Sequence, residues 1–414
     1  MDKLLYGCIG RKLTHSYSVA VHAELAGYDY KLIPLEPGEL DGFMREKNWN
    51  GINVTIPYKR DVMPYLDYID PVAEDIGAVN TVVNRGGKLY GYNTDIYGLT
   101  ALIRKTGVEV SGKKVLITGT GGTSRTAVKA VSLLGAKEFY RVGRNGTDGA
   151  LTYDEALSEH ADAQVIINCT PLGMFPDLIG QTPLDIDRFE NLEGVIDAVY
   201  NPLRSALVLK AQAKGIKASG GLYMLVMQAV EAVRHFTGED ITPQDCERAY
   251  HNVLLSKQNT VLIGMPACGK TTVGKLLAQK TGREFIDTDD LIEQSEGRKI
   301  SEIFACDGEE YFRNKETEII KSLINKTGAV IATGGGSVLR RENVDALKAN
   351  GRLYFLDRPL ESLVPTQSRP LSSDRESMER KYRERYPVYT SVADVHLKTG
   401  DVAEETVRKI TEDS

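Results

Sequence analysis

The stretch TVLIGMPACGKTT, residues 260–272, decides the fold of the last third of the chain. A short apolar run leads into the spacing G-x-x-x-x-G-K-[ST], which is set by Gly264, Gly269, Lys270 and Thr271. In such a loop, backbone N–H groups face a phosphate without interference from Cβ atoms, and the positive end of the next helix adds to the attraction. The stretch predicts a strand, a phosphate-binding loop and a helix, with Lys270 at the β- and γ-phosphates of a nucleotide. Thr271 is expected to hold Mg²⁺, and Cys268 and Thr272 to lie against the nucleotide.

A second glycine-rich stretch, KKVLITGTGGTSRTAVKAV at 113–131, also places a strand before glycines and a helix after them. The pattern is a variant of the dinucleotide loop, in which a small residue lets the helix pack closely on the strand. The residues expected to contact a dinucleotide are Gly119, Gly121, Gly122, Thr123 and Ser124. The next strand, EFYRVGRN at 138–145, ends with Arg144 rather than with the acid that holds the ribose of NAD. We therefore predict NADP over NAD, and the alternative is that Arg144 is an ordinary surface residue.

The composition limits the classes of protein to which the chain can belong. With 414 residues, 42% of them apolar, it is long enough for two or three domains with normal cores. The net charge of −6 argues against a nucleic-acid partner. The five widely spaced cysteines favour free thiols, and the absence of a long apolar segment favours a soluble cytoplasmic protein without membrane contact. The oligomeric state stays open.

Short β-rich runs alternate with helical patterns along the whole chain. The candidate strands lie at 4–9, 52–56, 114–118, 164–168, 194–199, 260–264, 284–289, 329–334 and 352–357. A helix is expected at 242–258, with Thr242 as its cap and Pro243 at its first position. This βαβ rhythm predicts an α/β protein with parallel sheets covered by helices.

Three stretches after the phosphate loop could name the phosphoryl acceptor. They are FIDTDD at 285–290, GEEYFRNKE at 308–316 and IATGGGSV at 331–338. Taken singly, they read equally well as a helix cap, a surface charge and a tight turn. Taken in order, and together with SRPL at 368–371 and RYPVY at 385–389, they closely resemble shikimate kinase over about 259–414.

That resemblance implies an acceptor site for shikimate in which two guanidinium groups hold one carboxylate. Asp289 would bind and activate the acceptor hydroxyl, and the glycine backbone would lie against the ring. The acceptor-binding residues implied are Asp289, Arg313, Gly334, Gly335, Gly336 and Arg385.

On the nucleotide side, the resemblance implies ATP and Mg²⁺, with Asp287 near the metal. Arg369, in a lid at 365–380, would neutralise charge on the transferring phosphoryl group. The chain departs from the family where Ala267 replaces a common third glycine, and where no arginine near Ser362 can pack on adenine.

The first segment carries an ordered set of polar stretches: THSYSVAVH at 14–22, NVTIPYK at 53–59, AVNTV at 78–82 and GYNTD at 91–95. Each alone could be capping or turn chemistry. Together with INCTPLGM, DAVYNPLRSALVLKA and GGLYMLVMQAVEA further on, they resemble shikimate 5-dehydrogenase over about 1–250. The substrate-binding residues implied are Ser16, Ser18, Thr55, Asn80, Asp95, Tyr200 and Gln228, with Gly221 at the cofactor.

Lys59 and Asp95 form the catalytic pair that this resemblance implies. Hydride attack on a ring ketone builds an alkoxide, which needs a proton and a nearby positive charge. Lys59 can supply both, and the sequence leaves open whether it donates the proton or only stabilises charge. The alternative is an exposed ion pair of small consequence. The family's arginine-containing motif at the NADP phosphate is reduced here to GRN at 143–145, so cofactor selectivity is expected to be looser than usual.

The sequence thus predicts a bifunctional enzyme that reduces 3-dehydroshikimate with NADPH and then phosphorylates shikimate with ATP. The expected domains are 1–105 with 221–250 for the substrate, 106–220 as a Rossmann-like NADP domain, 251–258 as a short linker and 259–414 as a P-loop kinase. Three alternatives stay open: one half could only bind ligand, the first half could use quinate, and Cys268 could be either a reactive thiol or a small filler.

Overall fold

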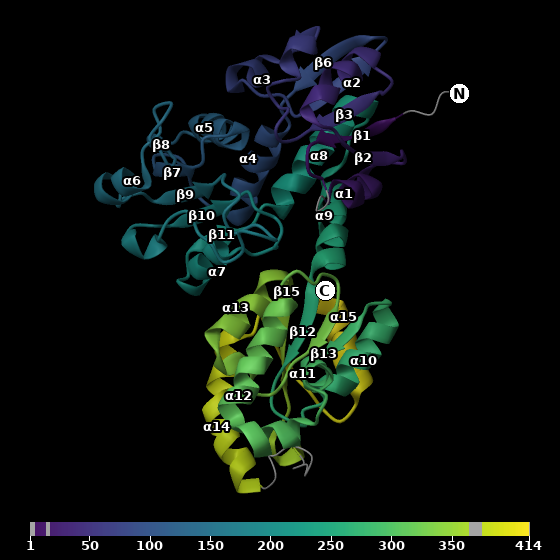
Figure 1. The fold of residues 1–414 in the computed structure, drawn as a ribbon, viewed down its shortest axis with the longest axis vertical. Coiled ribbons are helices and arrows are strands. Elements are labelled where there is room, and N and C mark those ends of the chain that lie inside the picture. The colour runs from purple at the N-terminus through teal and green to yellow at the C-terminus, as the bar shows by residue number, and fades with distance from the viewer. Residues whose placement is uncertain (1–4, 14–16, 364–374, 414) are drawn as a thin grey trace. The chain divides into compact units, whose positions relative to one another are not determined.

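The computed structural model describes residues 5–13, 17–363 and 375–413, and the chain forms two compact units (Figure 1). The first unit is Met1–Leu254 and the second is Leu255–Ser414. Within these described residues, two sheets lie in the first unit and one in the second. The α/β architecture expected from the sequence is confirmed.

The first sheet has six strands in the order β2-β1-β3-β5-β6-β4. Their bounds are β1 Tyr6–Gly10, β2 Tyr30–Pro34, β3 Gly51–Val54, β4 Tyr68–Ile69, β5 Thr81–Arg85 and β6 Lys88–Tyr92. The helices that belong to this part are α1 Ser18–Leu25, α2 Leu40–Glu46, α3 Pro71–Ile76 and α4 Asp95–Thr106. The carboxyl ends of β1 and β3 run in parallel, so both aim the following loops at the same edge.

The expectation of parallel sheets throughout is wrong for this first sheet, because β3, β5 and β6 pair antiparallel. Gly86 and Gly87 form the two-residue connection between β5 and β6, with φ of +60° and +85°. Two positive φ angles in a two-residue loop are what a type I′ hairpin requires. The Gly-Gly pair between two β-rich runs is therefore the signal in the sequence for this hairpin.

The second sheet is parallel throughout, in the order β11-β10-β9-β7-β8. Its strands are β7 Lys114–Thr118, β8 Glu138–Val142, β9 Val165–Asn168, β10 Gly194–Asp197 and β11 Lys217–Ser219. Its helices are α5 Gly122–Leu133, α6 Tyr153–Glu159 and α7 Ala206–Ala213. Val115, Leu116 and Ile117 of β7 are completely buried, as expected of a central strand covered on both faces.

Helix α8, Leu222–Thr237, follows the second sheet in sequence but packs with the first segment (Figure 1). Its side chains are buried almost all round, which is typical of an interior helix. A Cβ on Gly98 of α4 would collide with the backbone of α8, so a glycine is needed where these two helices cross. Gln228 of α8 thereby comes close to the start of α4.

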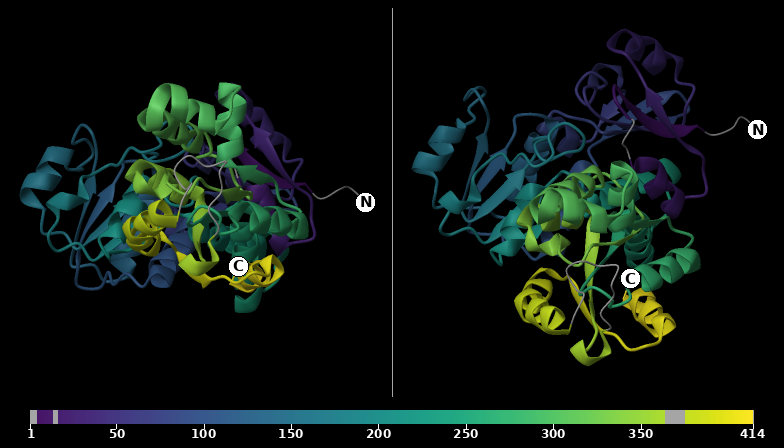
Figure 2. Two further views of the ribbon diagram at one scale, coloured as in Figure 1. Left: turned by 90° about the horizontal axis from the view of Figure 1, so that it is seen from below. Right: turned by 60° about the horizontal axis from the view of Figure 1, so that its bottom comes forward.

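The second unit has one parallel sheet in the order β13-β14-β12-β15-β16. Its strands are β12 Asn259–Ile263, β13 Phe285–Asp287, β14 Val330–Ala332, β15 Gly351–Asp357 and β16 Val395–Lys398. Its helices are α10 Lys270–Thr281, α11 Thr288–Glu296, α12 Ile300–Ser322, α13 Arg341–Asn350, α14 Arg375–Val392 and α15 Ala403–Asp413. Helices lie on both sides of this sheet, with α12 and α13 on one side and α10 and α15 on the other (Figures 1 and 2).

Helix α9, Pro243–Lys257, carries the chain from one unit to the next, and the border between Leu254 and Leu255 falls inside it. The Thr242 hydroxyl accepts a hydrogen bond from the Asp245 N–H at 3.1 Å, so the expected cap is confirmed. The segment 251–258, expected as a linker, is helical up to Lys257.

Candidate active sites

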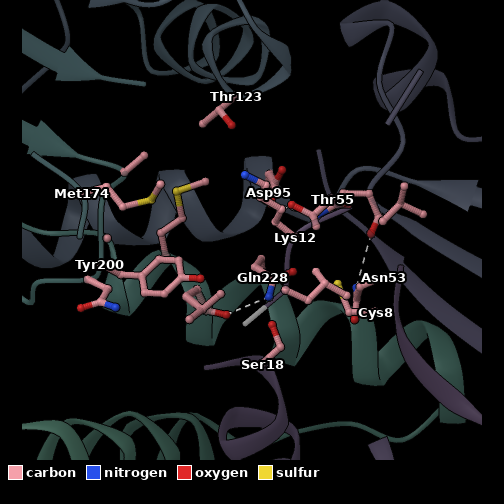
Figure 3. A pocket seen from close by; sticks show the side chains of 18 of the residues that line it. Cys8, Lys12, Ser18, Asn53, Thr55, Asp95, Thr123, Met174, Tyr200 and Gln228 are labelled. Carbon is pink, nitrogen blue, oxygen red and sulfur yellow. Dashed lines mark hydrogen bonds between the residues drawn. The ribbon is translucent and has the colours of Figure 1, made fainter. Parts of the chain in front are cut away.

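A cavity of roughly 530 Å³ lies in the first unit, lined by strands of its first sheet and by helices and loops around both of its sheets (Figure 3). In Figure 3, Met174 and Tyr200 stand on one side, Cys8 and Asn53 on the opposite side, and Thr123 of α5 at the top. The structure places these sequence-predicted residues around it: Ser18, Thr55, Lys59, Asn80, Asp95, Thr123, Tyr200, Gly221 and Gln228. Ser16 lies outside the described residues, so its role stays a prediction.

Lys59 and Asp95 form an ion pair in this cavity, with Nζ 2.5 Å from Oδ2. Both side chains are largely buried, with 15% and 11% of their surface exposed. Asp95 is also the first residue of α4, where the helix dipole favours a carboxylate. The pair is therefore a fixed feature of the cavity wall, unlike the solvent-exposed pair that was the alternative.

Asn80 holds the Asp95 carboxylate from the other side. Its Nδ2 donates to Asp95 Oδ1 at 2.8 Å, and its Oδ1 accepts from the Thr94 N–H at 2.7 Å. Gln228 donates from Nε2 to the Leu225 carbonyl at 2.9 Å, which leaves its Oε1 beside the Thr94 hydroxyl at 3.4 Å. These contacts fix the carboxylate so that Lys59 and a substrate hydroxyl can share it.

Sequence reasoning missed Asn53 and Cys8, which also line the cavity. Asn53 accepts from the Tyr30 hydroxyl at 2.6 Å and donates to Thr81 at 3.0 Å, so its amide is locked in place. An Asn inside the otherwise apolar run INVTI was the available signal. Burial raises the pKa of the Cys8 thiol to about 12, so this side chain is neutral.

The dinucleotide loop has the backbone that the cofactor requires. Gly119 has a φ of +108°, and a Cβ there would stand 3.1 Å from the Cys169 carbonyl oxygen. Gly121 is exposed just before α5, and the buried Ser124 hydroxyl donates to its carbonyl at 2.7 Å. A Cβ on Gly122 would lie 3.6 Å from Lys59 Cδ, so the loop reaches the catalytic pair. The exposed glycine backbone at a helix N-terminus fits a pyrophosphate.

Two further residues that are predicted to contact the cofactor, Arg144 and Gly221, lie outside the glycine loop. Arg144 is exposed two residues after β8, where it is accessible to a ligand phosphate. Gly221 lies just before α8, and a Cβ there would collide with the Ala198 carbonyl, so close packing alone already requires glycine. The roles of both residues at NADP stay predictions.

In the second unit the phosphate loop joins β12 to α10 as the spacing predicted. Gly264 and Gly269 have φ of +145° and +97°. Ala267 has a φ of +63°, a backbone conformation that favours glycine. Lys270 is buried and donates from Nζ to the carbonyls of Gly264 and Met265 at 2.8 and 2.9 Å, so it lies across the loop. Backbone amides, a helix N-terminus and a lysine together fit the phosphates of ATP.

Thr271 and Asp287 lie together, since the Thr271 hydroxyl donates to Asp287 Oδ2 at 2.8 Å. Mg²⁺ in nucleotide sites takes few protein oxygens, with water and phosphate completing its shell, so this pair of oxygens fits the metal. Among the described residues, no cluster of three or more His, Cys, Asp or Glu side chains could hold a metal ion alone. Thr272 is exposed, whereas Cys268 has only 3% of its surface exposed. The burial of Cys268 supports the reading of this residue as a small filler.

The three glycines after β14 bring the other predicted residues together. A Cβ on Gly334 would lie 2.6 Å from Glu316 Oε1 and 2.8 Å from Asp289 Oδ1. A Cβ on Gly335 would lie 2.8 Å from Pro266 of the phosphate loop, and one on Gly336 would collide with the Arg313 guanidinium. Glycine is therefore needed at all three positions for side chains or the loop to approach the backbone.

Arg313 is held by two glutamates that sequence reasoning missed. It donates to Glu316, which is completely buried, at 2.9 Å and to Glu309 at 3.1 Å. Burial would lower the pKa of Arg313, but the two glutamates, Glu316 before Glu309, raise it above its ordinary value. Glu316 also accepts from the Ser337 hydroxyl at 2.6 Å, so it ties Arg313 to the turn after the glycines.

Arg385 lies on α14 and is also buried. It neighbours Tyr389, whose hydroxyl donates to the Gly335 carbonyl, so α14 is fastened to the glycine turn. Arg369 lies outside the described residues, as does most of the expected lid at 365–380, and both stay predictions.

Comparisons with known proteins agree with the site found in the first unit. Residues 8–82 match the family model described as the shikimate dehydrogenase substrate binding domain. Over 242 residues, the chain is 35% identical to the shikimate dehydrogenase (NADP(+)) of Clostridium beijerinckii, covering 55% of this chain and 89% of the relative. The chain belongs to the shikimate dehydrogenase family.

Solved structures extend the family likeness to the fold. The shikimate 5-dehydrogenase of Thermus thermophilus, in complex with NADP(H) and shikimate, is 29% identical with a TM-score of 0.55, over 60% of this chain and 99% of that one. The quinate dehydrogenase of Corynebacterium glutamicum, in complex with NAD, is 27% identical with a TM-score of 0.54, over 61% and 99%.

The second unit has its own match, since residues 266–414 fit the family model of shikimate kinase. The chain is thus a fusion of a shikimate dehydrogenase with a shikimate kinase, as predicted. All five cysteines are free. Over the part of the chain that the structure describes, no helix is both apolar enough and long enough to span a membrane.

Proposed function

We propose that this chain carries out two consecutive reactions on one ring: NADPH-dependent reduction of 3-dehydroshikimate, then ATP-dependent phosphorylation of shikimate at its 3-hydroxyl. One observation carries the proposal: a buried Lys59–Asp95 pair beside a dinucleotide loop, and a phosphate loop beside two buried arginines, in the same polypeptide. When bound, NADPH supplies the hydride and ATP the phosphoryl group.

In the first reaction, Lys59 acts on the ketone oxygen as the hydride arrives at the ring carbon. Its ammonium lies within a buried ion pair, so it stabilises the developing alkoxide and can give it a proton. Asp95, fixed by Asn80, orients Lys59 and accepts a hydrogen bond from a neighbouring substrate hydroxyl. Ser16, Ser18, Thr55, Tyr200 and Gln228 are proposed to hold the remaining polar groups of the substrate.

In the second reaction, Asp289 accepts the proton of the attacking hydroxyl while Arg313 and Arg385 hold the carboxylate. Asp289 belongs to the first turn of α11, next to Gly334, so the acceptor would lie between α11 and the glycine turn. Lys270 must leave its two carbonyl partners to meet the phosphates of ATP. Thr271 and Asp287 are the residues that would hold Mg²⁺.

A single coupled assay tests both reactions. The full chain receives 3-dehydroshikimate, NADPH and Mg-ATP, and NADPH loss and ADP gain are recorded together. Equal final amounts of both are expected. NADPH loss without ADP formation would show that the second unit only binds ligand. No NADPH loss, with ADP formed only once shikimate itself is added, would show the reverse.

Quinate is a second candidate substrate for the first unit, since a quinate dehydrogenase shares its fold and 27% of its sequence. Comparing kcat/KM for quinate and shikimate in the oxidative direction separates the two. We also propose a cytoplasmic enzyme whose partners are small molecules, because the net charge of −6 disfavours nucleic acid.

A further inference from the structure

Helix α14 turns two cations toward the interior of the second unit. Its buried residues are Met378, Lys381, Arg385 and Tyr389, which follow one another along a single face. Lys381 has 8% of its surface exposed and Arg385 has 6%. Lysine is rarely buried to this extent unless a carboxylate or another acceptor compensates its charge. This lysine is not needed for the roles proposed above.

No such compensation is found for Lys381. Its Nζ is buried and has no hydrogen-bond acceptor among the described residues. Within those same residues, neither Lys381 nor Arg385 takes part in an ion pair, whereas Arg313 is paired with both Glu309 and Glu316. The face of α14 therefore brings positive charge into the interior that the described part of the chain does not neutralise.

The charged groups around Lys381 show which part of the second unit it faces. Burial, together with the neighbouring charges of Arg385, Arg380 and Arg313, lowers the pKa of Lys381 to about 8, while Glu309 opposes this shift. These four charged groups come from α14 and from the facing helix α12. Lys381 is thus within electrostatic range of both arginines that are proposed to hold the acceptor acid.

We propose that Lys381 is a third cation for the carboxylate of the acceptor, acting beside Arg313 and Arg385 and setting the preference of the kinase site for an acid. This inference rests on the proposed kinase function. Arg385 lies one helical turn away on the same face, and the flexible stem of lysine allows Nζ to reach an anion held there. An incoming carboxylate would supply the acceptor that Nζ lacks.

Because the acceptor carboxylate would attract the protonated form of Lys381, binding of the acceptor should depend on pH. Lys381 is protonated below pH 8 in the free protein, and a bound carboxylate raises its pKa, so the acid binds with uptake of a proton. The KM for shikimate is therefore lowest below pH 8 and rises above it.

The test is Lys381→Met in the full chain, with Met378→Leu on the same helix face as the matched control. We expect the KM for shikimate in the kinase reaction to rise about tenfold or more below pH 8. We expect the KM for ATP and the dehydrogenase kinetics to stay unchanged. The rise of KM above pH 8 should be present in the wild type and in Met378→Leu, and absent from Lys381→Met.

Calorimetry provides a readout that does not depend on turnover. Shikimate is titrated into each protein at pH 8 in two buffers of different ionisation enthalpy. Because the dehydrogenase pocket is the same in both proteins, the difference in proton uptake between wild type and Lys381→Met belongs to the kinase site. An uptake in the wild type that the variant lacks is expected.

Two outcomes overturn the inference: Lys381→Met with an unchanged KM and pH profile, or equal proton uptake in both proteins. If Lys381→Met fails to fold, Lys381→Arg decides instead, since it keeps the charge and should keep a low KM but lose the rise above pH 8. A fully active Lys381→Arg that keeps this rise would overturn the proposal. Failure of the proposed function is distinguishable, because the wild type would then form no ADP with shikimate.

Discussion

The two candidate sites of this chain, both proposed to bind a carboxylated ring, are built by different means. The dehydrogenase cavity has one ion pair, Lys59–Asp95, fixed by amides and hydroxyls. The kinase site instead brings Arg313 against a glycine turn that leaves no room for Cβ atoms, and the buried Arg385 lies on α14, which Tyr389 fastens to that turn. The first arrangement depends on hydrogen bonds made before substrate arrives, and the second on close packing around buried charge. Substitutions should therefore have different effects in the two units.

The largest expected effect is on the fixed ion pair of the first site. Lys59→Ala removes the proton source and leaves Asp95 without its cation, so kcat for 3-dehydroshikimate reduction should fall by about 10²- to 10⁴-fold. Kinase activity in the same chain is the internal control and should stay normal. A kcat within threefold of wild type, as a rough limit, would remove Lys59 from the mechanism.

Close packing in the second site is tested by Gly336→Ala. The added Cβ collides with the Arg313 guanidinium, which must leave Glu316, so kcat/KM for shikimate phosphorylation should fall by roughly 10²-fold. Gly400→Ala, at a position with open space, is the control and should behave as wild type. Equal kinetics for both variants would mean that the turn can move and that packing does not define this site.

A smaller effect is expected at the cofactor of the first site. If Arg144 meets the 2′-phosphate of NADP as a single exposed cation, Arg144→Ala should reduce the NADPH-over-NADH ratio of kcat/KM about tenfold. The change should lie in the NADPH value alone, since NADH lacks that phosphate. An unaltered ratio would show that Arg144 is an ordinary surface residue that does not contact the cofactor.

The smallest effect concerns the backbone of the phosphate loop. Ala267 has a φ of +63°, where a Cβ costs about 1–2 kcal/mol, so Ala267→Gly should stabilise the second unit by about 0.5–1 kcal/mol after the added chain entropy. Ala267→Val should destabilise it. Urea unfolding followed by loss of kinase activity measures both changes, and a shift of the same sign in both variants would contradict this account.

Much of the fold could be predicted because the parallel strands are short continuous apolar runs, and β7 begins and ends where expected, at Lys114 and Thr118. The antiparallel hairpin was missed because apolar and polar side chains alternate only weakly along its two strands. Gly86 and Gly87, which form its turn, were the available indication. In the sites, Glu316 was missed for a physical reason: in a run as charged as GEEYFRNKETE it looks solvated, and only the packing of α12 reveals that it is buried.

The helix at the border between the units limits where the chain can be divided into two separate proteins. Cys246, Ala249 and Val253 of α9 are buried in the first unit, whereas Leu255 and Lys257 accept hydrogen bonds from Arg283 and Gly328 of the second. A kinase fragment that begins at Asn259, where its first strand starts, would lose both of these acceptors. A fragment intended to keep them must start no later than Leu255, inside a helix that the other half also needs.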